Sequence, residues 1–240
     1  MWSDPSHPLR IQIRESARSR RLCVRVDRDA LVEVVVPRGT PRQRVTRFLA
    51  EHEEWIARRV ARANPLPPEA FPPAQISFDA IGESWRLHLA GGTRRLKLVT
   101  LAPGLLQIQG AMEPAALRNQ LRSWVVDRAR ETLPDLARAF ASGFGEKLSG
   151  VQVRTQRTRW GSCSVRRVIS LNAAILFQTP AVLRYLLAHE VGHLRHMNHS
   201  QAFWSTVAQF EPHWRELDRQ LLRGWERVPR WFRERSVEQP

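Results

Sequence analysis

The sequence predicts an α+β fold: an N-terminal antiparallel β-rich region with one helix, followed by a largely helical core that contains a small β-hairpin. Three observations carry this prediction. Apolar and polar residues alternate in residues 9–36 and 85–108, as in half-buried strands. Apolar residues recur at helical spacing between 113 and 222, and a stretch with five prolines, 64–75, interrupts the chain.

The N-terminal region, residues 1–63, is expected to contain a β-hairpin and a helix. Strands are predicted at 9–13, 22–26 and 31–36, with Asp27–Ala30 as a turn between the last two. Thr40 and Pro41 open the single helix. Residues 64–75 are expected to form a stiff linker, because proline restricts the backbone.

Residues 76–112 are expected to form antiparallel strands that continue the N-terminal β region. A long helix begins near Glu113 and should break or kink at Pro134, because proline removes a backbone hydrogen bond. Strands 151–154 and 168–172 then flank a hairpin tip. The helix 180–197 begins at a Thr-Pro pair.

Further helices are expected in 200–222, with a bend at Pro212. The last segment, 224–240, is basic and contains Trp225, Trp231 and Phe232. These aromatic side chains are expected to dock on the body of the protein.

The predicted helix 180–197 contains His-Glu-Val-Gly-His, which matches the H-E-x-x-H pattern. Residues four apart lie on one face of a helix, so His189 and His193 can direct two imidazoles at one metal ion. Glu190 is then placed to take a proton from a water on that metal. This is the arrangement of zinc hydrolases, with two histidine ligands and a general base.

A catalytic zinc ion usually has three protein ligands. His199 follows His193 at the interval found in the metzincin pattern, although His196 stands where that pattern has glycine. Asn198 could make the required turn in the left-handed conformation, and Ser200 could cap the next helix. His199 is therefore the predicted third ligand. The alternative is Glu211, at the position of a thermolysin-type ligand.

Composition limits the classes of function. The formal net charge is +15, which suggests contact with nucleic acid, but the 38 basic residues are spread along the chain. Only Lys97 and Lys147 among them are lysines, an arginine bias that a GC-rich genome also produces. With just two cysteines, Cys23 and Cys163, and apolar runs too short to cross a bilayer, the chain is expected to be cytoplasmic, without a membrane.

These residues resemble the YgjP-like metallopeptidase family of predicted metal-dependent hydrolases. The resemblance rests on three stretches: Arg159–Ser164, Ile169–Asn172, and the segment from His189 to Pro212. It implies a zincin-like catalytic core, expected at 113–223, in which His189, His193 and His199 bind one zinc ion per chain.

The resemblance also implies positions for two arginines, and residue type suggests a role for one asparagine. Arg157 and Arg159 would lie near the site, where either could stabilise an oxyanion or bind a carboxylate or phosphate of the substrate. Asn172 could orient a ligand histidine by accepting its hydrogen bond. The family is similar in pattern to SprT-type proteases, which act on proteins bound to DNA. This similarity is a second reason to consider nucleic acid as a partner of the positively charged chain.

The function predicted from these observations is a zinc-dependent hydrolase that cleaves peptides or proteins. Some relatives are described instead as nucleotide pyrophosphatases, so a nucleoside triphosphate pyrophosphohydrolase at the same metal is one alternative. A nucleic-acid-associated module with a structural zinc is the other. A structural zinc normally has four protein ligands and no open position, and the presence of Glu190 beside the ligands argues against it.

Overall fold

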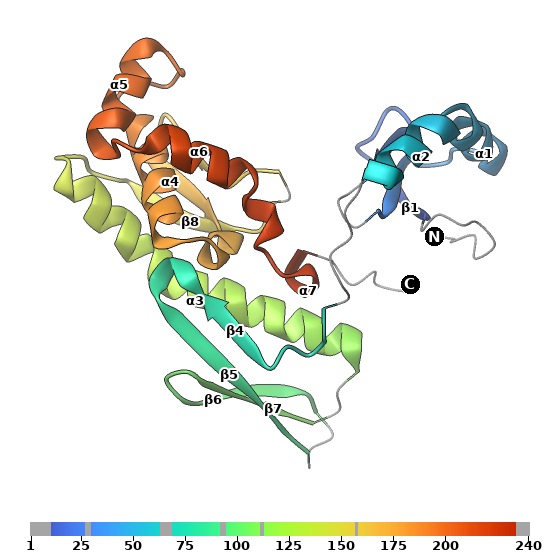
Figure 1. Cartoon of the computed structure of the whole chain (residues 1–240), viewed down its shortest axis with the longest axis horizontal. Helices are drawn as coiled ribbons and strands as arrows, with labels where there is room; N and C mark the ends of the chain where they lie inside the picture. Colours follow the sequence, from blue (N-terminus) through green and yellow to red (C-terminus); the bar gives the residue numbers. More distant parts are fainter. Residues whose placement is uncertain are drawn as a thin grey trace. The chain divides into compact units, whose positions relative to one another are not determined.

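The computed structural model of the chain describes residues 11–26, 30–62, 69–91, 95–110, 113–156 and 158–233. The chain forms two compact units, Met1–Pro68 and Glu69–Pro240 (Figure 1). Helices and small mixed sheets occur in the described parts of the chain, which confirms the α+β class.

The first unit contains a three-stranded sheet in the order β1-β3-β2. Its strands are β1 (Ile11–Ser16), β2 (Cys23–Val26) and β3 (Val32–Pro37). The expected antiparallel hairpin of β2 and β3 is present, but β1 pairs with β3 in parallel, so the sheet is mixed. The valines of β3 are buried on both faces, which suits a central strand and places β1 beside it.

Two helices pack on this sheet where one was expected. They are α1 (Arg42–Glu51) and α2 (Glu53–Arg62), and the helical backbone is interrupted at His52. The ring of His52 lies 4.2 Å from the ring of Phe48 and is tilted by 35° to it, and its Nδ1 lies 2.8 Å from the Phe48 carbonyl oxygen. Val45 and Ile56, on either side of the break, still pack in one core. The helical spacing of apolar residues therefore continues across His52 and gives no sign of the break.

The second unit begins with its own four-stranded sheet in the order β4-β5-β7-β6. The strands are β4 (Gln75–Phe78), β5 (Glu83–Ala90), β6 (Lys97–Ala102) and β7 (Leu105–Gln109). No strand of this sheet pairs with β1–β3 in the described ranges, so the expected continuation of the N-terminal β region is wrong. The sheet is also mixed, because β5 and β7 are parallel.

The expected linker 64–75 is shorter than the proline pattern indicated. Gln75 already begins β4, and Glu69 to Ala74 belong to the second unit. Residues 64–68 lie outside the described part of the chain.

The long helix α3 (Pro114–Gly143) continues through Pro134, so, of the expected break or kink, the break does not occur. One face of α3 is buried along its whole length, including Leu133 and Ala137 on either side of the proline. Proline inside a helix costs about 3 kcal/mol, an amount that burial of one or two large apolar side chains offsets. Figure 1 shows α3 between the four-stranded sheet and the part of the unit that contains α4.

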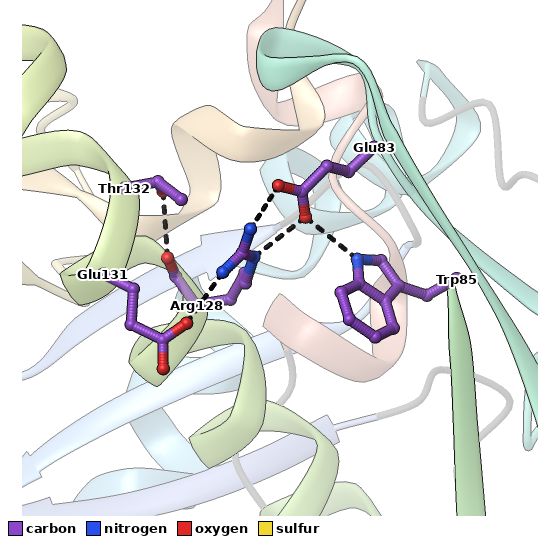
Figure 2. Close-up of polar contacts among 5 residues, drawn as sticks. All are labelled: Glu83, Trp85, Arg128, Glu131 and Thr132. Carbon is purple, nitrogen blue, oxygen red and sulfur yellow. Dashed lines mark hydrogen bonds and ion pairs between the residues drawn. The ribbon is translucent and has the colours of Figure 1, made fainter. Parts of the chain in front are cut away.

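An ion pair fixes α3 to the four-stranded sheet (Figure 2). Arg128 on α3 donates from Nε to Glu83 Oε2 at 2.8 Å and from Nη2 to Glu83 Oε1. The indole of Trp85 donates to the same carboxylate at 3.0 Å. The hydrogen bonds from Arg128 hold the pKa of Glu83 below its ordinary value, so the carboxylate stays charged at the contact.

A second small sheet lies beside the candidate site, in the order β8-β10-β9. Its strands are β8 (Gly150–Arg154), β9 (Gly161–Cys163) and β10 (Val168–Asn172). Strands were expected at 151–154 and 168–172, but these two are parallel neighbours rather than the arms of a hairpin. The hairpin is formed by β10 and β9, a strand inside the expected loop.

The remaining elements complete the core of the second unit. They are η1 (Asp79–Ile81), η2 (Ala173–Phe177), α4 (Pro180–Gly192), α5 (Gln201–Phe210), α6 (Trp214–Leu222), η3 (Gly224–Glu226) and α7 (Arg230–Arg233). Trp225 stacks on Trp160 at 4.3 Å, and Trp231 and Phe232 are buried, so the expected docking of the C-terminal aromatics is confirmed. Within the described ranges, no helix combines the length and apolar character needed to cross a membrane.

Candidate metal centre

Helix α4 presents the H-E-x-x-H motif from a well-defined start. The side chain of Thr179 accepts a hydrogen bond from the Val182 N–H at 3.3 Å, and proline occupies the first helical position. The helix ends at Gly192, five residues before the expected end. A Cβ at Gly192 would lie 3.1 Å from Val207 and 3.2 Å from Phe203, so glycine permits the close approach of α4 and α5.

The turn after α4 brings His199 back toward the helix. The amides of Arg195 and His196 both donate to the Gly192 carbonyl at 3.1 Å, which closes the turn. Asn198 is not in the left-handed conformation, since the described non-glycine residues with positive φ are Ala30 and Arg167, so that expectation is wrong. Ser200 caps α5 as expected, accepting from Phe203 N at 3.4 Å.

His189, His193 and His199 converge on one point. One ring nitrogen from each lies within 4.8 Å of the other two, and Nε2 of His189 is 3.2 Å from Nε2 of His199. Two nitrogen ligands on a tetrahedral zinc ion stand about 3.3 Å apart, given Zn–N distances of about 2.0–2.1 Å. The spacing of these two nitrogens fits a common zinc ion.

Aromatic side chains of α5 hold the three imidazole rings. The ring of Phe203 lies 5.0, 4.5 and 4.8 Å from the rings of His189, His193 and His199. His199 is exposed, and the indole of Trp204 lies nearly parallel to its ring at 5.7 Å. Packing therefore restricts the orientation even of the exposed histidine.

Two of the imidazoles have a hydrogen-bond partner at Nδ1, on the side away from the point of convergence. His193 Nδ1 lies 3.0 Å from the His196 carbonyl oxygen, and His189 Nδ1 lies 3.4 Å from the Tyr185 hydroxyl. A proton on Nδ1 leaves the Nε2 lone pair for a metal. Burial, and then the neighbouring histidines, lower the pKa of His189 to about 3; burial also lowers the pKa of His193. Both imidazoles are therefore neutral near pH 7, as ligands must be.

Glu190 lies beside these ligands in a buried position. Its side chain is 4% exposed, and Oε2 has no hydrogen-bond partner among the described residues. Burial raises the pKa of Glu190 to about 8. A buried carboxyl with an unpaired oxygen is costly, so a water or a cation is expected beside this group.

The backbone of β9 makes room for that carboxyl group. A Cβ on Gly161 would overlap Oε1 of Glu190 and lie 2.9 Å from its Cδ. Only glycine fits this close approach. A functional role for Gly161 was not predicted from the sequence, although the residue lies in the Trp-Gly-Ser-Cys segment that carries the family resemblance.

A family model for the YgjP-like metallopeptidase domain matches residues 20–223. The chain belongs to this family. Its membership makes it a metallopeptidase domain, and hence a metal-dependent hydrolase. The matched residues include parts of both compact units.

Other comparisons add little to this assignment. The crystal structure of the metallopeptidase zymogen of Pyrococcus abyssi abylysin is similar at 23% sequence identity and a TM-score of 0.35, over 38% of this chain and 93% of that one. A search among curated proteins finds no significant match.

In this YgjP-like domain, Glu211 does not join the histidine cluster. Its Oε2 accepts from Arg184 Nε at 2.8 Å, and Oε1 accepts from the His213 N–H at 3.4 Å. The cluster of potential metal ligands found among the described residues consists of the three histidines. Glu211 instead ties the end of α5 to α4, because Arg184 lies on α4 and also donates to the Phe210 carbonyl.

Asn172 does not contact a ligand histidine, so its expected role is wrong. Its amide nitrogen donates to the carbonyls of Gln156 and Arg159 at 2.6 and 2.8 Å, and its backbone N–H donates to Trp160 O at 2.7 Å. Asn172 therefore holds the loop that precedes β9. The side chain of Arg159 is exposed at the end of that loop, and Arg157 lies outside the described residues.

Glu146, which sequence reasoning also missed, connects two segments that build the site. Its Oε1 accepts from Arg195 at 2.8 Å, in the turn after α4. Its Oε2 accepts from Arg167 at 2.6 Å, in the turn between β9 and β10. These hydrogen bonds, that from Arg195 foremost, lower the pKa of Glu146.

The stability that Glu146 contributes should depend on pH. A lowered pKa means that this contribution is complete above the ordinary value of 4.5 and is lost as the pH falls through the folded-state pKa. We expect Glu146→Gln to lower the melting temperature by about 2–4 °C at pH 7, and by less at pH 3. Thermal unfolding of both proteins at the two pH values measures this, and an equal difference at pH 3 would contradict it.

Proposed function

We propose that this YgjP-like domain is a zinc-dependent peptidase. His189, His193 and His199 hold one zinc ion per chain, and Glu190 acts as the general base. The observation that carries the proposal is the convergence of the three imidazoles, with the Nε2 atoms of His189 and His199 3.2 Å apart. The same donor set also fits the metal ion that a metallopeptidase domain implies.

Zinc, when bound, would supply a Lewis acid that polarises the scissile carbonyl and makes a water nucleophilic near neutral pH. Glu190 takes the proton of the attacking water and passes it to the leaving amine. The burial that raises the pKa of Glu190 also keeps solvent water away from its carboxyl group. The proton that Glu190 accepts is therefore not exchanged with solvent. The positive charge of a dication close by favours the carboxylate, the form that accepts the first proton.

The substrate side of the site is proposed to be β9. This strand is the edge of its sheet, hydrogen-bonded to β10 and to no other strand in the described part of the chain. Gly161 of β9 lies against Glu190, so an extended peptide paired with this edge would run past the general base. Arg159 precedes this edge and is proposed to bind a substrate carboxylate or a developing oxyanion. The same role is proposed for Arg157.

The number of protein ligands supports a catalytic rather than a structural metal. A structural zinc site is closed by four protein ligands, whereas the cluster identified in the described ranges offers three. Three ligands leave a position open for water and substrate. This observation favours the hydrolase over a nucleic-acid module with structural zinc.

A paired screen tests the proposal. Zinc-loaded protein is incubated with a quenched-fluorescence peptide library and, separately, with a panel of nucleoside triphosphates. We expect peptide cleavage that stops in His193→Ala and no release of phosphate or pyrophosphate. Metal-dependent nucleotide hydrolysis without peptide cleavage would replace the peptidase by a pyrophosphohydrolase.

A further inference from the structure

One side chain outside the motif, Tyr185, contacts the first histidine of the cluster, and a second, Asp218, contacts that tyrosine. Tyr185 lies on α4, one turn before His189, and Asp218 lies on α6. The tyrosine is 1% exposed. Its hydroxyl donates to Asp218 Oδ1 at 2.7 Å and lies 3.4 Å from His189 Nδ1. The three groups thus form a chain of polar contacts from a carboxylate, through a phenol, to an imidazole.

The number of protons on these groups decides which atom donates and which accepts in each hydrogen bond. A tyrosine hydroxyl has one proton, and at 2.7 Å from a carboxylate that proton is directed at Asp218. The oxygen then faces His189 with its lone pairs, so the ring nitrogen must be the donor in that contact. His189 is therefore held as the tautomer with hydrogen on Nδ1.

The tautomer of His189 decides which ring nitrogen can bind a metal. With the proton on Nδ1, the lone pair of His189 is on Nε2, the atom that faces Nε2 of His199. A carboxylate at the end of this chain of contacts also increases the electron density of the imidazole, because it stabilises partial positive charge on the Nδ1–H. His193, by contrast, has a neutral backbone carbonyl at the equivalent place.

We propose that Asp218 and Tyr185 are positioning residues for the metal ligand His189: they select its tautomer, fix its ring and raise the affinity of the site for zinc. This inference rests on the proposed zinc site. It also gives α6 a part in the site, since Asp218 extends from α6 to α4, two helices that pack together.

The first test is made without metal. In protein freed of zinc, long-range ¹H–¹⁵N correlation spectra of the imidazoles report which nitrogen of His189 carries hydrogen. We expect the Nδ1-protonated form in the wild type and a mixture of tautomers in Tyr185→Phe. A wild-type His189 protonated at Nε2 would overturn the proposal, whatever the fate of the zinc-site proposal.

The second test measures zinc affinity by competition with a chelator. Tyr185→Phe and Asp218→Asn are each expected to weaken zinc binding about 10–100-fold, with melting temperatures of the metal-free proteins close to that of the wild type. Asp127→Asn is the matched control, because Asp127 pairs with Arg130 on the surface of α3. Its zinc affinity should equal that of the wild type.

The outcomes separate this proposal from the proposed function. Wild-type affinity in both site variants would overturn the positioning role while leaving the zinc peptidase intact. Absence of zinc binding in the wild type would instead remove the proposed function, and the tautomer spectra of the metal-free protein would still decide whether Tyr185 orients His189. Because Asp218→Asn leaves the tyrosine ring packed in the core, it keeps the test valid if Tyr185→Phe fails to fold.

Discussion

Replacement of Glu190 by Gln is expected to lower peptide turnover by about 10²–10⁴-fold, the usual contribution of a general base, without loss of bound zinc. Glutamine matches the carboxyl in size and fits the same buried position, but it cannot accept a proton from the attacking water. The proposed zinc ligands are untouched. Initial rates on a cleaved peptide, measured beside zinc content by mass spectrometry, test the expectation.

Glu54→Gln provides the control for the loss of a negative charge. Glu54 lies on α2 in the first unit, and its side chain is 90% exposed. Its turnover should match that of the wild type. Full activity in Glu190→Gln would remove Glu190 from the chemistry, and loss of zinc together with activity would indicate that it supports the metal site instead.

Gly161→Ala is expected to lower turnover nearly as much as Glu190→Gln, although it removes no proposed catalytic group. The added methyl group would overlap Oε1 of Glu190 and approach its Cδ to 2.9 Å, so the carboxyl must move from its present position. Misplacement of a catalytic group by about 1 Å can cost about 10²-fold in rate. The proposed metal ligands lie on α4 and in the turn after it, so zinc content should not change.

A second glycine in the same sheet gives a matched control. A Cβ on Gly150, in β8, would lie 3.7 Å from a methyl group of Val168, an ordinary contact. Gly150→Ala should therefore leave turnover and zinc content unchanged. Equal activity of Gly161→Ala and the wild type would show that the position of the Glu190 carboxyl does not limit catalysis.

The histidine cluster could be predicted because its geometry is local. The period of the α-helix places His189 and His193 on one face, and a short turn returns His199 to it. The details of that turn could not be predicted. The sequence suggested a left-handed Asn198, whereas hydrogen bonds to the Gly192 carbonyl end the helix early.

Residues that act through distant contacts were missed or misassigned. Asp218 reaches Tyr185 across 33 positions, and Glu146 reaches Arg195 across 49. No spacing rule connects residues so far apart. Asn172 was assigned to a histidine, yet its partners are backbone carbonyls of a neighbouring loop, which have no sequence signature.

The errors in the fold have the same origin. Pro134 was expected to break or kink α3, and the break does not occur. Local propensity does not register the burial of the face on which Leu133 and Ala137 lie. The strands expected in residues 76–112 were predicted to extend the first sheet, because alternation identifies strands but not their partners. Tertiary packing decided both cases.

The metal content of three purified, untagged proteins tests the central claim most directly: the wild type, His199→Ala and Glu211→Ala. We predict about one zinc per chain in the wild type, as a three-histidine site holds, and the same in Glu211→Ala, because Glu211 pairs with Arg184. His199→Ala should lose the zinc. Zinc retained in His199→Ala but lost in Glu211→Ala, or no zinc in the wild type after reconstitution, would contradict the three-histidine metal centre.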